Sequence, residues 1–189
     1  TVIVLPMHSE TLIAKQVATL DVLSNGRVVL GVGTGGREED YRAVGAPFEK
    51  RLARMEAQVA RMREIWRGVP PHEGASPIGP APVQSGGPAV LVGAITPKSI
   101  ERCARWADGL CGFTFGPDLD QAQKSFERFA RSWQAAGRAG APRKVSSFWY
   151  ALGPRAERQM ETFVRRYLAI FGSDAVEAMV RELAGKLDQ

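Results

Sequence analysis

The sequence LIAKQVATLDVLSNGRVVLGVGTGG, residues 12–36, contains a helix, a sharp stop, a buried strand and a glycine-rich exit. In its first half, apolar side chains recur at the spacing of one helix face, at Leu12, Ile13, Val17, Leu20 and Leu23. Asn25 and Gly26 predict the end of the helix, because both residues tolerate the left-handed backbone of a helix C-terminus. Residues 27–32 form a short apolar run rich in β-branched residues, which is typical of a strand covered on both faces.

Helix–strand units of this kind recur along the chain. Further strands are expected at residues 2–5, 89–92, 110–114 and 145–152. Further helices are expected at residues 48–67, 96–106, 117–136 and 154–171 and from residue 173 on, with Ser9 and Thr96 as N-caps. The Pro/Gly-rich segment 68–88 is predicted to be a loop insertion within one domain that includes residues 1–189. Strands that alternate with helices predict an α/β fold with parallel strands, and both a doubly wound sheet and a (β/α)8 barrel satisfy this pattern.

Composition argues against several classes of protein. The net charge is +5, from 25 Lys+Arg against 20 Asp+Glu, but the arginines are scattered beside glutamates, so a solvated surface is favoured over nucleic-acid binding. The two cysteines, Cys103 and Cys111, form no CxxC pair and no metal-ligand cluster is found, so we expect no metal site and a cytoplasmic location. No apolar run reaches the roughly 20 residues of a membrane span. Neither G-x-S-x-G nor a P-loop lysine is present to support a hydrolase or a kinase.

The glycine-rich exit at residues 31–36 matches the pattern G-x-G-x-x-G of dinucleotide-binding folds. That pattern requires a helix to begin at once, so that the helix N-terminus meets the pyrophosphate. Here the sequence that follows, REEDYRAVGAPF, provides one charged turn and then a break. We therefore interpret Gly33, Gly35 and Gly36 as part of a strand end that leaves room for a flat ring.

A second strand end, within residues 92–99, has the features of an anion site. Gly93 and Ala94 are small, and a helix that begins at Thr96 would direct free backbone amides and its positive dipole end toward a phosphate. Gly93, Ala94, Ile95 and Thr96 are thus the candidate phosphate ligands. An ordinary strand-to-helix turn with an N-cap explains the same residues equally well.

Few side chains are candidates for direct chemistry. His8 and Ser9 follow the first strand, at the edge where α/β folds bind their ligands, and His8 is the one candidate catalytic residue; an exposed loop histidine is the alternative. Asp21 and Arg27 flank the helix stop and are predicted to pair there. Asp108 is interpreted as part of a turn into a strand, not as a catalytic acid.

Three segments together resemble the luciferase-like monooxygenase family, which comprises flavoproteins of the bacterial-luciferase type and their relatives that use coenzyme F420. The segments are AKQVATLDVLSNGRVVLGVGTGG at 14–36, EEDYRAVGAPFEKRLARMEAQVARMREIW at 38–66 and PAVLVGAITPKSIERCARWADG at 88–109. The resemblance implies a (β/α)8 barrel of the TIM type, with FMN or F420 at the carboxyl ends of its strands. Such a barrel has about 250 residues. Its N-terminal and C-terminal strands are therefore expected to be absent from residues 1–189.

The resemblance also implies roles for individual residues. Members of the family bind the cofactor phosphate through backbone amides of the turn that corresponds to residues 93–96, and the position that touches the ring after the first strand corresponds to Ser9. The sequence departs from the family pattern at Glu10, where proline is usual, and at Ala94, where glycine is common.

The activity implied by the resemblance is that of a flavin-dependent oxidoreductase, a monooxygenase that uses reduced FMN or F420 and acts on a small molecule. Its expected partners are O2, a separate flavin reductase and a second copy in a homodimer, with no nucleic acid and no membrane. Two alternatives stay open. One is an F420-dependent reductase or dehydrogenase without oxygen chemistry. The other is a cofactor-free truncated barrel that acts as an interaction protein through an exposed edge strand.

Overall fold

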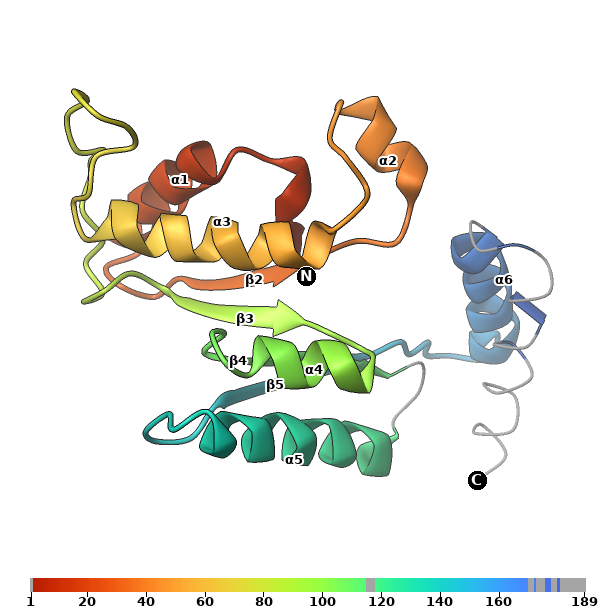
Figure 1. The fold of residues 1–189 in the computed structure, drawn as a ribbon. Coiled ribbons are helices and arrows are strands. Elements are labelled where there is room, and N and C mark those ends of the chain that lie inside the picture. Colours follow the sequence, from red (N-terminus) through yellow and green to blue (C-terminus); the bar gives the residue numbers. More distant parts are fainter. Residues whose placement is uncertain (1, 115–117, 170–171, 173–175, 178–179, 181–189) are drawn as a thin grey trace.

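Five parallel strands form one sheet in the computed structural model, in the order β1-β2-β3-β4-β5 (Figure 1). The structure describes residues 2–114, 118–169, 172, 176–177 and 180. The strands are β1 Ile3–Val4, β2 Val29–Gly33, β3 Ala89–Gly93, β4 Gly109–Thr114 and β5 Arg143–Phe148. The helices are η1 Leu5–Met7, α1 Glu10–Leu23, α2 Glu38–Ala43, α3 Arg51–Trp66, α4 Pro97–Cys103, α5 Leu119–Ala135 and α6 Ala156–Leu168.

Helices α1, α3, α4 and α5 pack on the same face of the sheet. The hydrophobic core joins alternate strand residues to apolar side chains of these helices; the strand residues are Leu30, Val32, Val90, Val92 and Leu110. In a doubly wound sheet, helices cover both faces and the strand order reverses at a switch point. Here the strand order follows the chain and the helices share one face, so the sheet is an arc of a (β/α)8-type barrel. This confirms the fold class that the family resemblance implied.

The predicted start and end of the first helix are confirmed. Ser9 caps α1, because its Oγ accepts a hydrogen bond of 3.4 Å from the backbone N–H of Leu12. Asn25 and Gly26 end the helix with φ angles of 53° and 76°, both in the left-handed region. In the same way, Thr96 caps α4 through a bond from the N–H of Ser99.

Two predicted strands differ from the structure. β1 is shorter than predicted because the 3-10 turn η1 begins at Leu5. β5 begins at Arg143 and ends at Phe148, earlier than the predicted 145–152, and all six of its residues are exposed. Among the described residues β5 pairs at one edge only, with β4, and its side chains are exposed, unlike the buried strand predicted at residues 27–32. The predicted helix from residue 173, and the ends of those at 117–136 and 154–171, fall wholly or partly outside the described residues.

The predicted pairing of Asp21 with Arg27 is wrong. Asp21 is fully buried. Its carboxylate accepts two hydrogen bonds from Gln84, one from the backbone N–H at 2.9 Å and one from the side-chain Nε2 at 2.7 Å. Arg27 is exposed and instead donates from Nε to the carbonyl of Ser24, at 2.7 Å. Gln84 lies in the proline-rich loop between α3 and β3, so Asp21 fastens that loop to the C-terminal end of α1.

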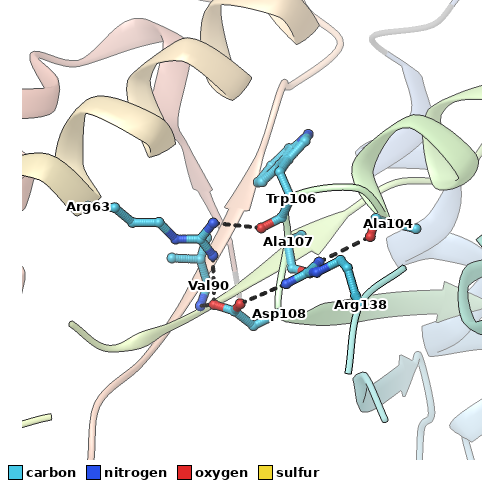
Figure 2. A network of polar contacts seen from close by, with 7 residues as sticks. All are labelled: Arg63, Val90, Ala104, Trp106, Ala107, Asp108 and Arg138. Carbon is cyan, nitrogen blue, oxygen red and sulfur yellow. Dashed lines mark hydrogen bonds and ion pairs between the residues drawn. The ribbon is translucent and has the colours of Figure 1, made fainter. Parts of the chain in front are cut away.

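Asp108, immediately before β4, connects several elements at the N-terminal edge of the sheet (Figure 2). Its Oδ2 accepts hydrogen bonds from the N–H of Val90 at 2.9 Å and from Nη2 of Arg63 at 2.8 Å, and its Oδ1 lies 3.3 Å from Nη2 of Arg138. The two guanidinium groups also donate to backbone carbonyls, those of Trp106, Ala104 and Ala107. The predicted turn into a strand is confirmed. Since ligands bind at the opposite edge of such barrels, Asp108 has a stabilising role.

Replacing Asp108 by alanine is expected to lower the free energy of unfolding by about 2 kcal/mol. Val90 N–H loses its acceptor, and Arg63 and Arg138 lose their shared carboxylate. The carboxyl side chain is 31% exposed, so solvent screens part of the loss. Urea unfolding at pH 7 measures the change, with Glu73→Ala in the exposed loop as the control, expected within about 0.5 kcal/mol of the wild type. A change as small as that for Asp108→Ala would contradict the stabilising role.

Asp21 is expected to make stability depend on pH. Burial would raise the pKa of its carboxyl, but hydrogen bonds from the backbone and side chain of Gln84 lower that pKa below its ordinary value. A carboxylate of this kind contributes stability above its unfolded-state pKa of about 3.9 and loses it as the pH falls through the lower folded-state pKa. We expect Asp21→Asn to cost about 1–3 kcal/mol at pH 7 and less at pH 3. Urea unfolding of both proteins at the two pH values tests this, and an equal cost at both would refute it.

Candidate functional site

The predicted site residues lie at one edge of the sheet. Because β1, β2 and β3 are parallel, the residues that follow them gather at the C-terminal edge. The register brings the last residues of the three strands side by side, with Val4 opposite Gly33 and Gly33 opposite Gly93. His8 and Ser9 follow β1, Gly35 and Gly36 follow β2, and Ala94, Ile95 and Thr96 follow β3.

The turn from β3 into α4 presents backbone donors at this edge. Ile95 is 79% exposed, and Thr96 is exposed as well. Within the described chain, no acceptor is found for the backbone N–H groups of Ile95, Thr96 and Lys98. The Thr96 hydroxyl is engaged, since it bonds to Ser99 Oγ at 2.9 Å. The backbone amides of this turn are therefore donors available to an anion, beside the exposed Lys98 side chain, and such donors suit the phosphate oxygens of a nucleotide-like cofactor.

The glycines at the ends of β2 and β3 pack against Val2, which precedes β1. A methyl group on Gly33 would lie 3.1 Å from Val2 Cγ2, and one on Gly93 would lie 3.5 Å from Val2 Cγ1. Gly35 has a φ of 63°, and a methyl group there would lie 2.9 Å from Val4 Cγ1, so only glycine fits without strain. Gly36 is exposed. Gly33 and Gly35 therefore have a structural reason to be glycine, because Val2 and Val4 occupy the space beside them.

Tyr41 and Arg51 hold the loop after β2, and no role was predicted for either residue. Tyr41 is buried, its Oη donates to the carbonyl of Thr34, and its ring packs edge-on against Phe48 at 5.2 Å. Burial raises the pKa of Tyr41 although Arg51 and Arg54 lie nearby, so the phenol stays a hydrogen-bond donor. Arg51 donates from Nε to the carbonyl of Gly35 at 3.4 Å. Tyr41 lies in the charged turn after the glycines, where nothing in the pattern marks it as a support.

The side chain of His8 is exposed, and its backbone is held by two hydrogen bonds. Its N–H donates to the carbonyl of Leu5 at 2.9 Å, and its carbonyl accepts from Nε2 of Gln58 at 2.8 Å. Gln58 is a buried polar residue in the apolar face of α3, which is the signal that marks it as a support. Its Oε1 has no partner among the described residues. The His8 ring itself makes no hydrogen bond to the described part of the chain and faces solvent at the site edge.

A group of aromatic residues at the same edge was not predicted. We call Phe113, Trp149, Phe163 and Tyr167 the aromatic wall. Phe113 is on β4, Trp149 follows β5, and the other two are on α6, which lies past the C-terminal ends of the strands (Figure 1). The sequence predicted the separate elements, but no periodic pattern links residues from three of them.

The described residues contain no cluster of His, Cys, Asp and Glu that would hold a metal ion. Nor does any helix in the described ranges have the length and apolar character needed to cross a membrane.

The luciferase-like monooxygenase family model matches residues 1–189. An uncharacterized protein of Mycobacterium tuberculosis is 32% identical over 200 residues, which cover 99% of this chain and 69% of that relative.

Solved structures show the same fold. Monooxygenase RslO1 from Streptomyces bottropensis has a TM-score of 0.70 at 22% identity; the match covers 95% of this chain and 58% of the RslO1 chain. The oxygenating constituent of 3,6-diketocamphane monooxygenase from Pseudomonas putida, in complex with FMN, has a TM-score of 0.66 at 17% identity, covering 90% and 57%. An F420-dependent secondary alcohol dehydrogenase has a TM-score of 0.64 at 18% identity, covering 92% and 58%. The chain thus spans little more than half the length of these solved proteins.

Proposed function

The chain belongs to the luciferase-like monooxygenase family, and from that premise we propose that it carries the cofactor-binding edge of a flavin- or F420-dependent oxidoreductase. The observation that carries the proposal is the turn from β3 into α4. Its N–H groups at Ile95, Thr96 and Lys98 lack acceptors within the described chain and lie at the same edge as Ser9. In this proposal the reaction is that of a monooxygenase, with reduced FMN or F420 at the C-terminal edge of the barrel.

The residues present fit a phosphate-tailed cofactor. Backbone amides of Gly93, Ala94, Ile95 and Thr96 would hold the phosphate, and Ser9 would lie near the ring, with clearance from Gly33, Gly35 and Gly36. When bound, FMN or F420 supplies hydride transfer or the activation of O2. The chain's own part is to orient the ring, exclude water from one of its faces and fix the phosphate. His8 is the candidate to exchange a proton with the substrate.

An F420-dependent reductase or dehydrogenase is the second candidate. The net charge of +5 supports it, because positive charge suits the acidic tail of F420, and its fold is shared by the F420-dependent secondary alcohol dehydrogenase as well as by the monooxygenases. In either case we propose a small-molecule substrate, a cytoplasmic location and a homodimer. The monooxygenase would in addition need O2 and a separate flavin reductase.

Two substitutions at Thr96 test the phosphate site. Thr96→Ala removes the capping hydroxyl and keeps the backbone N–H. Thr96→Pro also removes the N–H, and the φ of −77° at this position suits proline. A hydrogen bond to a charged group is worth about 1.5–3 kcal/mol, so Thr96→Pro should bind the cofactor about tenfold or more weakly than Thr96→Ala.

The measurement is titration of the purified protein with FMN and with F420, followed by cofactor fluorescence, with circular dichroism as the check on folding. Tighter binding of F420 than of FMN would favour the second candidate. Equal affinities for the two variants, both folded, would contradict the phosphate site. A folded wild type that binds neither cofactor would instead support the interaction protein with its exposed β5 edge.

A further inference from the structure

The aromatic wall is a connected group of ring contacts. The Trp149 ring lies 5.1 Å from that of Phe113, 5.4 Å from that of Phe163 and 5.2 Å from that of Tyr167, each edge-to-face. Phe163 and Tyr167, one turn apart on α6, stack at 5.7 Å. Such arrangements are the favoured geometries of aromatic pairs. The four rings therefore pack against one another as one group.

The wall stands on the face of the sheet that the helices leave uncovered. A methyl group on Gly112 would lie 3.6 Å from the Phe126 ring of α5, so Gly112 faces the helices. Successive residues of a strand point to opposite faces, which places Phe113 on the inner face. Trp149 contacts Phe113 there. The wall thus borders the inner face at the C-terminal edge, where the proposed cofactor site also lies.

Packing within α6 does not use the whole of these rings. The helix is anchored by Val164 and Leu168, which are buried in a small cluster with Val176. Phe163 and Tyr167, in contrast, remain 50% and 55% exposed. Arg165 of the same helix forms ion pairs with Glu161 and Glu177. The exposed surface of Phe163 and Tyr167 is therefore largely aromatic, and it lies on a helix whose own core is formed by other residues.

We propose that the aromatic wall is the substrate-selecting surface of the enzyme and that it takes a planar, apolar small molecule. This inference rests on the proposed function, because the wall acts as a substrate surface only if the cofactor binds at the same edge. A flat apolar molecule gains edge-to-face and stacking contacts with the rings.

The test uses 2-acetylnaphthalene as the planar probe and its fully saturated analogue as the non-planar one, titrated calorimetrically into the purified protein. We expect the planar probe to bind at least about fivefold more tightly. Phe163→Ala and Tyr167→Ala should each weaken its binding about tenfold, whereas Tyr167→Phe, which keeps the ring, should stay within about twofold of the wild type. Tyr150→Ala is the matched control, because Tyr150 is 71% exposed and lies outside the wall.

Equal binding of the two probes, or unchanged binding in both alanine variants, would overturn the proposal. Circular dichroism checks that each variant is folded; both altered residues are half-exposed, so their loss leaves the α6 core in place. FMN and F420 titrations of the same variants separate the two proposals. If the alanine variants lose binding of the planar probe but keep their affinity for the cofactor, the result supports the aromatic wall as the substrate surface. If the wild type binds the planar probe but neither cofactor, the proposed function is refuted, and with it the role of the wall in an enzyme.

Discussion

The burial of four helices against the same face of a parallel sheet determines where everything else in the molecule lies. Each parallel strand needs a crossover before the next, and a right-handed crossover returns on the same side of the sheet each time the strand order advances by one. Leu30, Val32 and Val90 point into that layer and make its core. The opposite face carries the alternate residues of each strand, among them Leu91 and Phe113, and all the loops that follow strands meet at one edge. The candidate site is a consequence of this packing.

The two edges of the sheet have different physical characters. At the N-terminal edge, Asp108 uses both carboxylate oxygens, and Arg63 and Arg138 are bound to it and to backbone carbonyls (Figure 2). At the C-terminal edge, by contrast, the N–H groups of the β3–α4 turn have no acceptor among the residues that the structure describes, and the rings of Phe163 and Tyr167 are half-exposed. Polar groups that are satisfied contribute to stability, and those left open are available to a ligand. The division matches the separation of a stabilising and a functional face in barrels of this type.

The sequence was informative where the determinants are local. The amphipathic pattern of α1, its cap at Ser9 and its stop at Asn25 and Gly26 depend on neighbours within a few residues. It was uninformative where a side chain meets a distant partner. Asp21 bonds to Gln84, 63 residues away, and nothing in the composition of the proline-rich loop marks that glutamine. The nearer Arg27 looked like the natural partner, but it is exposed whereas Asp21 is buried.

The candidate site was predictable to the same extent. Parallel strands dictate that residues after β1, β2 and β3 share an edge, so the sequence sufficed to group Ser9 with Thr96. The aromatic wall depends on how β4, β5 and α6 approach one another, which no periodicity encodes. This difference also bears on specificity. The donors at the β3–α4 turn are backbone amides, which most substitutions leave in place, whereas the wall consists entirely of side chains. In the enzyme that we propose, a substitution in the wall would therefore change the preferred substrate and leave the phosphate site intact, provided that Gly93 and its neighbours keep their backbone path.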